Sequence, residues 1–585
     1  MSPTFLERPL VAALLRRFRP SPFSIGVALA VAVGALAGLA SVAFDYLIDI
    51  FDTLFFDVLL DGFSSLGRYD VLLLPAIGGL IVGPMIYFLA REVRGSGIPE
   101  VMLAVARDGG RIRSRVSLVK ILSTSVSIGS GASVGREGPI VQIGSSMGSF
   151  LGQRFGVSEG WLKILVACGA AGGISATFNA PIAGVFFALE VVLRTFSLQN
   201  FGVVVISSVT ASAVAVGAFG DFRAFTVPVY GLNHPAELGL FALLGVGAAL
   251  LALGFMQAIK IVEGGFSRSH LPDYLKPAIG GLGVGVIGVF YPEVFGVGYE
   301  VITEALVDGL PLLLLLALIF LKPLATSLAI GSGSTGGVFA PSLFLGAIAG
   351  AGFGELMGDA FPGIAGDPGG YGLAGMAGVF AAAASAPMTA LLIVFEMSRS
   401  YSMVVPLMLT VVISTAISRK LSRESIYTAR LIRRGLDLRR FLRFDPAWNV
   451  KTWEVMTRDY PTIQASASID EVLQTFEKTG VHGLPVLEDG NLVGIVTATD
   501  VEQAMMTESE ARSAGDIATR SLVTAQRDQT IAEVMEKLGA REVGYIPVVD
   551  AQEPLRLLGV LRRQDIIRAY AMAAQRTREE HESSA

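Results

Sequence analysis

Long hydrophobic stretches alternate with short polar ones over the first 420 residues of the chain. Many approach or exceed the roughly 20 residues that cross a bilayer as a helix, and several are shorter. We therefore expect a polytopic, all-helical membrane domain in which some helices are interrupted. The expected apolar segments lie near residues 25–47, 71–90, 117–131, 139–153, 161–193, 201–219, 236–262, 274–292, 310–330, 338–357, 371–396 and 402–418.

Glycine-rich polar pieces interrupt this pattern at three places, GSGIPE at 95–100, GSGASVGREGP at 129–139 and GSGSTGGVFAP at 331–341. Non-helical backbone of this kind is tolerated inside a membrane only where protein buries it or where it lines a wet cavity. Broken helices at corresponding places in two halves of a chain are typical of inverted repeats around a mid-membrane binding site. We expect such repeats here, with halves at about 25–225 and 235–430.

Beyond residue 450 the pattern changes to short α/β units. The segments 483–500 and 544–565 share a Pro-Val pair, a turn and an apolar strand that ends near an aspartate. Each follows an amphipathic stretch, near 469–480 and 530–540, that predicts a helix. Two α/β modules of about 60 residues are therefore expected.

Composition agrees with a membrane body followed by a soluble tail. Hydrophobic residues make up 52% of the chain and charged residues 16%, with a mean hydropathy of +0.61; soluble domains carry about 25% charged residues. Residues 451–585 hold 14 basic and 22 acidic side chains. The net charge of −5 gives no reason to propose nucleic-acid binding.

Basic residues indicate the orientation in the membrane. Nine Lys or Arg lie between 419 and 443, opposed by two acidic residues, and such clusters face the cytoplasm. The N-terminal segment, 1–24, is also basic, and the apolar run that follows it is too long for a signal peptide. Both termini are expected to be cytoplasmic, in a cell inner or plasma membrane.

The interruptions carry groups that suit an anion. Pro99, Pro139 and Pro341 mark the first turns of helices, so each interruption places N–H groups or a hydroxyl at a helix N-terminus. Such a terminus carries about half a positive charge, enough to hold an anion without a lysine that would retain it too tightly. Glycines that only allow close helix packing are the alternative interpretation.

Other classes of function find less support. The single cysteine, Cys168, and four scattered histidines offer no metal-ligand spacing, so no metal site is expected. A membrane-embedded enzyme that used Glu137 or Cys168 would need a nucleophile–base pair or a metal cluster. A divalent-cation transporter would need clustered acidic residues within the spans. We therefore expect no enzyme activity.

Five motifs occur in a fixed order: GSGIPE, GREGP followed by QIG (142–144), FNAPIAG (178–184), GGVFAP and SIYTA (425–429). With them, residues 25–430 resemble the CLC family of chloride channels and proton/chloride exchangers. The resemblance implies the CLC fold, an all-α polytopic membrane domain with inverted repeats and broken helices. It also implies a homodimer in the lipid bilayer, with one anion pathway in each subunit.

The resemblance assigns roles to single residues. Ser96 and Tyr427 would donate hydroxyls to the central anion, the amides of Val338 and Phe339 would complete its site, and Glu137 would be the gating glutamate. Relatives that prefer nitrate replace the serine of GSGIP by proline, and fluoride exporters also alter this region. Because Ser96 is retained, chloride is the expected ion, and bromide and nitrate are expected to pass as well.

Glu137 has a physical reason to act as a gate. An ionised carboxylate among helix N-termini mimics an anion and occupies the site meant for chloride, whereas a protonated one has no reason to stay there. Acid is therefore expected to favour the open state. A structural ion pair between Glu137 and Arg136 is the alternative.

One position generally differs between the channels and the exchangers of this family. Exchangers generally carry an inner, proton-passing glutamate in a Glu-Glu pair at the end of the helix begun by Asn-Ala-Pro. Here the pair reads Glu190–Val191, so a valine, which binds no proton, stands at the inner position, as in channel members; Glu190 matches the structural glutamate. A passive chloride channel is favoured, and a proton-coupled chloride exchanger in which water replaces the carboxylate is the alternative.

The tail resembles a pair of CBS domains, at 452–508 and 514–575, after a linker at 431–451 and before a terminal segment at 576–585. The resemblance predicts an α/β cytoplasmic domain that modulates the membrane part.

In CBS domains, a Thr or Ser three residues before an Asp binds the ribose and phosphates of adenine nucleotides. Thr497 and Asp500 match this pattern, and the second copy has Asp565 with Arg562 at the hydroxyl position. ATP, ADP or AMP is thus a candidate ligand, with no cofactor required and no hydrolysis implied, since the chain has no GxxxxGK[ST] loop. A ligand-free assembly and gating module is the alternative.

Overall fold

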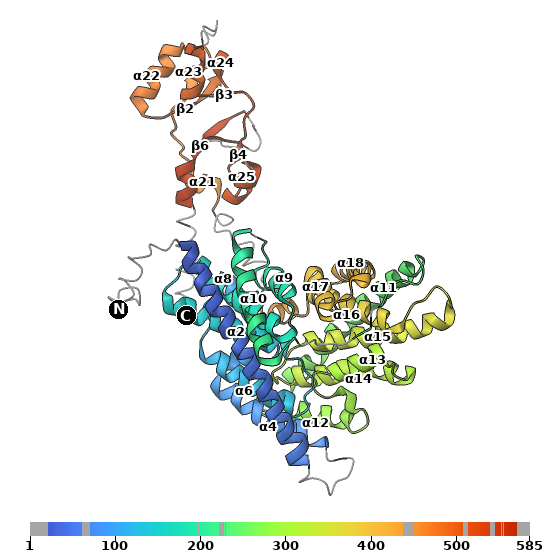
Figure 1. The fold of residues 1–585 in the computed structure, drawn as a ribbon. Coiled ribbons are helices and arrows are strands. Elements are labelled where there is room, and N and C mark those ends of the chain that lie inside the picture. Colours follow the sequence, from blue (N-terminus) through green and yellow to red (C-terminus); the bar gives the residue numbers. More distant parts are fainter. Residues whose placement is uncertain are drawn as a thin grey trace. The chain divides into compact units, whose positions relative to one another are not determined.

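The computed structural model (Figure 1) has two compact units, Met1–Leu438 and Arg439–Ala585. Most of the expected N-terminal segment (1–24), linker (431–451) and terminal segment (576–585) lies outside the described residues. The described residues are 22–60, 69, 71–196, 198–221, 227–228, 230–436, 450–506, 513–538, 544–550, 553, 555–569 and 572.

The first half of the membrane unit runs from blue to green in Figure 1, and its described elements are all helices joined by loops. Its helices are α2 (Pro22–Asp52), α4 (Leu74–Pro84), α5 (Ile98–Ala106), α6 (Arg115–Gly129), α7 (Glu137–Phe155), α8 (Glu159–Phe178), α9 (Pro181–Phe187) and α10 (Leu198–Phe219). Shorter turns of other helix types are η2 (Thr53–Leu59), η4 (Met85–Leu89), η5 (Arg91–Val93) and η6 (Ala188–Leu193).

The second half repeats this order and runs from green through yellow to orange in Figure 1. Its helices are α11 (Glu237–Arg268), α12 (Lys276–Gly288), α13 (Tyr299–Val307), α14 (Leu312–Gly331), α15 (Phe339–Ala360), α16 (Pro368–Ala384), α17 (Pro387–Ser398), α18 (Val404–Leu421) and α19 (Thr428–Arg433). Its short turns are η7 (Pro292–Val294) and η8 (Tyr401–Met403).

The described part of the chain has seven helical segments that are long and apolar enough to cross a membrane. They are Ser24–Leu59, Glu159–Phe178, Phe201–Phe219, Glu237–Arg268, Leu312–Gly331, Phe339–Ala360 and Tyr401–Leu421. Three shorter apolar helices accompany them, at Leu74–Leu89, Pro181–Leu193 and Pro387–Ser398.

Two of the expected apolar stretches, 161–193 and 371–396, are each broken into two helices. Asn179 (φ 51°) ends the first helix of one pair and Ser385 (φ 55°) ends that of the other, both in the left-handed region. Two positions later a proline starts the next helix in both cases, because its fixed φ suits a first helical turn. Continuous hydrophobicity hides these breaks from a reading of periodicity alone.

Glycines let the two halves approach closely where α4 packs on α12. A Cβ atom on Gly79 would lie 2.3 Å from the carbonyl oxygen of Pro277, and one on Gly281 would lie 2.1 Å from that of Pro75. The same contact is thus made once from each half, as expected for a repeated structure.

The second unit contains two similar three-stranded sheets. The strands are β1 (Ile463–Gln464), β2 (Gly483–Glu488) and β3 (Asn491–Thr497), then β4 (Ala525–Gln526), β5 (Tyr545–Val549) and β6 (Leu557–Arg562). In each sheet the first strand pairs in parallel with the second, and the second pairs antiparallel with the third. The helices are α21 (Thr452–Val455), α22 (Ile469–Thr479), α23 (Ala498–Met506), α24 (Ala514–Ile517) and α25 (Ile531–Leu538); α22 and α25 lie where the sequence predicted helices.

Candidate functional site

The three glycine-rich interruptions lie against one another in the membrane unit. Gly95 forms a parallel bridge with Thr335, and its N–H donates to the carbonyl of Ser334 at 2.9 Å. Gly135 and Gly337 exchange two backbone hydrogen bonds, of 2.8 and 2.6 Å. The starts of α5, α7 and α15 therefore converge on one region.

Hydroxyl groups join two of the interruptions, 129–139 and 331–341, to a helix of the other half. Thr335 lies 2.9 Å from Thr124 of α6, and Ser133 lies 3.2 Å from Thr326 of α14 (hydroxyl oxygens). Because α6 and α14 are corresponding helices of the two repeats, these bonds form a reciprocal pair. They fix the interruptions relative to each other across the repeat boundary.

Three helix N-termini supply positive polarisation at this place. α5 begins at Ile98, α7 at Glu137 and α15 at Phe339, so Pro139 and Pro341 lie in first turns, as the sequence predicted. A helix N-terminus carries about half a positive charge on its unpaired N–H groups. Together the three ends can hold an anion with backbone dipoles alone.

The carboxylate of Glu137 occupies part of this region. Its side chain is fully buried. Oε1 accepts a hydrogen bond from the hydroxyl of Tyr299, at the start of α13, and Oε2 accepts one from the N–H of Ala340, in the first turn of α15, at 3.2 Å. The carboxylate thus lies where a free anion at the α15 N-terminus would have to lie.

Arg136 pairs with another residue. Its guanidinium lies 2.7 Å from Oδ1 of Asp45 on α2 and sits over the ring of Tyr299, 5.4 Å from the ring centroid. Arg136 therefore contributes positive charge near Glu137, while its own ion pair ties α7 to α2. The carboxylate of Glu137 instead accepts hydrogen bonds from Tyr299 and Ala340.

The other residues that the sequence predicted to bind the anion are buried. Ser96 and Tyr427 are 5% and 1% exposed, and the Tyr427 hydroxyl has no hydrogen-bond partner among the described residues. Val338 is the N-cap of α15, and the ring of Phe339 stacks on that of Phe178 with 5.6 Å between centroids. A buried hydroxyl without a protein partner is unusual, and an anion would supply the missing acceptor.

One backbone contact and one side-chain contact hold the segment around Tyr427 near the first interruption. The N–H of Ile426 donates to the carbonyl of Ala383, at the end of α16, at 2.8 Å. One turn along α19, Arg430 donates to the carbonyl of Arg94 at 3.1 Å, two residues before Ser96. The segment that carries Tyr427 is therefore tied both to the second half and to the loop that carries Ser96.

Two buried lysines fix the loops before α5 and α13. Lys120 donates to the carbonyls of Val93 and Gly95 at 2.9 and 2.7 Å. Lys322, at the corresponding place, donates to three carbonyls between Val294 and Gly296 at 2.9 to 3.3 Å. Each ammonium group satisfies the carbonyl side of its loop, which helps to hold the helix start that follows.

The Glu190–Val191 pair divides into two roles. Val191 is buried and carries no titratable group. The carboxylate of Glu190 accepts hydrogen bonds at the start of α17, from the N–H of Met388 (3.2 Å) and from the N–H (2.8 Å) and hydroxyl (2.7 Å) of Thr389. Glu190 is therefore a helix cap that acts between the two halves.

The second half returns the same contact. The carboxylate of Glu396 accepts from the N–H groups of Ile182 (3.0 Å) and Ala183 (2.6 Å), at the start of α9. Each half thus supplies the acidic cap of a helix in the other half. We call Glu190 and Glu396 the reciprocal caps.

Sequence reasoning missed Tyr299, Glu396 and the two lysines. A signal for Tyr299 is present, because GVGYE at 296–300 follows the spacing of GSGIPE at 95–100, and both Gly97 and Gly298 adopt positive φ before a helix. Its contact with Glu137 spans 162 positions, a distance at which local pattern carries no information.

In the α/β unit, Thr497 and Asp500 line a cavity of about 240 Å3. The N–H and hydroxyl of Thr497 donate to Oδ2 of Asp500 at 2.7 and 2.6 Å, which closes a turn at the end of β3. Tyr545 and Ser521, from the second module, also line this cavity. It is therefore shared between the two modules.

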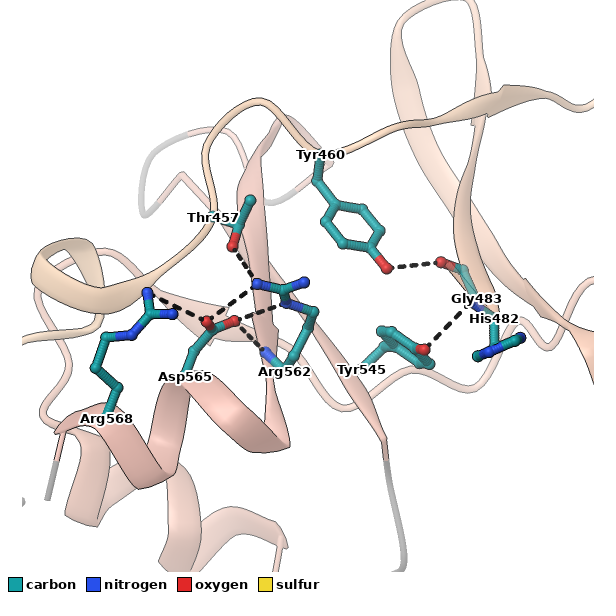
Figure 2. A network of polar contacts seen from close by, with 8 residues as sticks. All are labelled: Thr457, Tyr460, His482, Gly483, Tyr545, Arg562, Asp565 and Arg568. Atoms are coloured by element: carbon teal, nitrogen blue, oxygen red, sulfur yellow. Dashed lines mark hydrogen bonds and ion pairs between the residues drawn. The ribbon is translucent and has the colours of Figure 1, made fainter. Parts of the chain in front are cut away.

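Asp565 lies in a different environment, shown in Figure 2. It is fully buried and pairs with Arg562, 3.0 Å from Nε to Oδ2; this hydrogen bond and charge raise the pKa of Arg562. Arg562 also donates to the hydroxyl of Thr457 at 3.3 Å. In the second module, Arg562 stands at the position of the hydroxyl residue Thr497 and forms an internal ion pair with Asp565. Asp565 is not among the residues that line the cavity.

Tyrosines occupy the space beside this ion pair. Tyr460 donates to the carbonyl of Gly483 at 3.1 Å, and Tyr545 accepts from the N–H of His482 at 3.3 Å (Figure 2). Burial raises the pKa of Tyr460 to about 12, so its hydroxyl stays protonated and remains a donor at neutral pH.

Comparison with known proteins agrees with this geometry. The family model described as "Voltage gated chloride channel" matches residues 78–419, and the CBS domain model matches 453–507 and 514–572. A putative chloride channel protein ClcB-like of Ralstonia nicotianae is 36% identical over 380 residues, 64% of this chain and 88% of the relative. An H(+)/Cl(−) exchange transporter ClcA of Vibrio cholerae is 35% identical over 428 residues, 71% of this chain and 90% of the relative.

Among solved structures, that of a slow cyanobacterial Cl−/H+ antiporter has the same fold, with a TM-score of 0.65 and 24% identity over 71% of this chain and 98% of that one. The two family matches thus agree with the structure, which has converging helix starts, an internal repeat and paired α/β modules. The chain belongs to the voltage-gated chloride channel (CLC) family of chloride channels and proton/chloride exchange transporters, which are not enzymes, and it carries two CBS domains.

Proposed function

We propose that this protein is a passive chloride channel whose gate is Glu137. The observation that carries the proposal is the position of the Glu137 carboxylate on the N–H of Ala340 at the start of α15. The ionised side chain competes with chloride for that helix end, and protonation removes the competition. Ser96, Tyr427 and the amides of Val338 and Phe339 bind the ion that replaces it.

The second candidate function is proton-coupled chloride exchange. It is favoured by the relative from Vibrio cholerae that is named an exchange transporter. Against it stands Val191, since a valine offers no proton acceptor on the inner side of the site. Coupling would then require a water chain in place of a carboxylate.

Reversal potentials separate the two functions. In a planar bilayer with a fixed chloride gradient, we expect an added gradient of two pH units to leave the reversal potential of the wild-type protein unchanged. A channel passes chloride without protons, so only the chloride gradient sets that potential. A shift that corresponds to a constant proton-to-chloride ratio would establish the exchanger and reject the channel.

Tyr299 is expected to hold the ionised gate in place. The Tyr299→Phe variant lacks the hydroxyl that donates to Glu137, and a hydrogen bond to a charged group contributes about 1.5–3 kcal/mol. Because this bond favours the ionised, occluding form, its loss should move the pH of half-maximal chloride flux upward by about one unit. The measurement is chloride efflux from proteoliposomes between pH 4.5 and 8; an unchanged profile would exclude the contact from gating.

We infer further that one adenine nucleotide binds in the cavity beside Thr497 and Asp500. The carboxylate of Asp500 suits ribose hydroxyls. The hydroxyl of Thr497 suits a phosphate once it turns away from Oδ2 of Asp500, to which it donates in the structure. The second copy offers no equivalent place, because Arg562 already neutralises Asp565. Binding of one ATP, ADP or AMP in each chain is the expected stoichiometry.

Calorimetric titration of the full chain with ATP tests this site. Asp500→Ala should weaken ATP binding at least about tenfold, since it removes a charged acceptor. Glu488→Ala removes the same charge from the exposed end of β2 and should leave binding unchanged. If the wild-type protein releases no heat with ATP, ADP or AMP, the CBS pair is a module without a nucleotide ligand.

A homodimer in the cell membrane, with both termini in the cytoplasm, completes the proposal. The basic cluster between 419 and 443 supports this orientation through the positive-inside rule.

A further inference from the structure

One cavity of the membrane unit lies away from Glu137 and the helix starts around it. It has a volume of about 650 Å3 and is lined by seven residues, among them Arg113, Arg115, Arg154 and Phe150. We call it the arginine pocket. Phe150 is 13 positions beyond Glu137 on α7, which corresponds to about 20 Å along the helix. The pocket therefore lies well away from Glu137.

Hydrogen bonds hold the wall of the pocket in place. The N–H of Ile112 donates to the hydroxyl of Ser149 on α7 at 2.8 Å, and that hydroxyl donates to the carbonyl of Gly110 at 2.7 Å. The amide of Gln153 donates to the carbonyl of Ile112 at 3.1 Å. The loop between α5 and α6 is thus fastened to α7, and its arginines project from a fixed backbone.

The charged residues that line the pocket are all arginines. None of its seven lining residues is acidic. Arg113 makes one ion pair, 3.1 Å from Glu92; this pair is mostly exposed and of the kind that contributes little. The site suits a group with more than one negative oxygen, because guanidinium groups bind phosphate with two parallel hydrogen bonds.

An apolar surface continues directly from the arginines. Leu118 and Leu122 follow Arg115 by three and seven positions on α6, so they share one helix face, and they are 68% and 44% exposed. Phe150, four positions before Arg154 on α7, is 50% exposed. A cationic pocket bordered by exposed apolar side chains matches a molecule with an anionic head and hydrocarbon chains.

The second repeat has no such pocket loop. The loop between α13 and α14, residues 308–311, is four residues long and reads Asp-Gly-Leu-Pro, whereas the loop between α5 and α6 is eight residues long and contains Arg107, Arg111 and Arg113. The fold itself does not require the basic loop, since the repeat is completed without it. The arginines are a separate feature of one membrane face.

We propose that the arginine pocket binds the headgroup of an anionic phospholipid whose acyl chains lie along Leu118, Leu122 and Phe150. Basic pockets between membrane helices are typical places for such headgroups. The N-terminal segment of the chain is an unsuitable occupant, because Arg8, Arg16, Arg17 and Arg19 make it basic. Bound lipid would contact both the loop after α5 and the end of α7. Both of these helices start at the anion site.

Thermal unfolding of the purified full-length protein in a neutral detergent tests the proposal. Dioctanoyl phosphatidylglycerol should raise the Tm by about 5 °C at saturation, whereas dioctanoyl phosphatidylcholine and inorganic phosphate should not. The triple variant Arg113→Gln, Arg115→Gln, Arg154→Gln should need at least about tenfold more phosphatidylglycerol for half of the shift. The matched control Lys260→Gln, Arg268→Gln, Arg423→Gln, at exposed basic positions elsewhere, should respond as the wild type does.

Each other outcome overturns the proposal. An equal shift with phosphate would make this a site for free anions, and equal weakening in the control would mean unspecific attraction. A change in oligomeric mass of the triple variant would mean that a second copy covers the pocket. Should the triple variant fail to fold, native mass spectrometry of the wild type and of Arg154→Gln replaces it, and retention of phosphatidylcholine as readily as phosphatidylglycerol contradicts the proposal.

Discussion

The Glu137→Gln variant is expected to conduct chloride at a rate that no longer depends on pH. Glutamine has the size of the protonated side chain and carries no charge, so it does not compete with chloride for the N–H of Ala340. If the open form of the wild type is a minor state at neutral pH, populated at about 0.1–10%, the flux at pH 7.5 should rise roughly tenfold or more. Chloride efflux from proteoliposomes between pH 4.5 and 8 measures both effects.

Glu300→Gln is the matched control for this experiment. It removes one carboxylate from an exposed position next to Tyr299 on α13, so it changes the local charge equally without touching the site. Its flux should keep the acid activation of the wild type. If Glu137→Gln itself retained that activation, another group would be the proton sensor.

The second large effect is expected for the reciprocal caps. Glu396→Ala leaves the N–H groups of Ile182 and Ala183 without their carboxylate acceptor, and Glu190→Ala does the same to Met388 and Thr389. Each loss should cost about 3 kcal/mol of stability, since charged hydrogen bonds and a helix dipole are lost together.

Thermal unfolding in detergent, followed by intrinsic fluorescence, measures this cost. Each variant should unfold about 5 °C or more below the wild type. Glu304→Ala, at an exposed position on α13, should unfold with the wild type. Equal Tm values for the wild type and both cap variants would mean that water caps these helices as well as the carboxylates do.

Much of the architecture could be predicted because it follows from local rules. Prolines and glycines predicted the helix starts near 98, 137 and 339, and the amphipathic pattern predicted α22 and α25. The break at Ser385 was missed, because a serine in the left-handed region leaves no mark in an apolar stretch.

The features of the site that could not be predicted from the sequence depend on contacts between residues far apart in the chain. Tyr299 reaches Glu137 only because the two repeats fold onto each other. Asp565 was grouped with Thr497 and Asp500 by motif, and the structure separates it from their cavity because Arg562 pairs with it. A motif records which residues are present, whereas the partner of each is decided by tertiary packing.

The exchange of caps also affects how the protein is made. During synthesis the first amides of α9 leave the ribosome long before their acceptor, which lies 214 positions later. Until that carboxylate arrives, the early half holds an unfinished helix start within the lipid and cannot reach its final packing. A fragment that ends near residue 225 should therefore be degraded when it is expressed alone, and co-expression with the rest of the chain should rescue it.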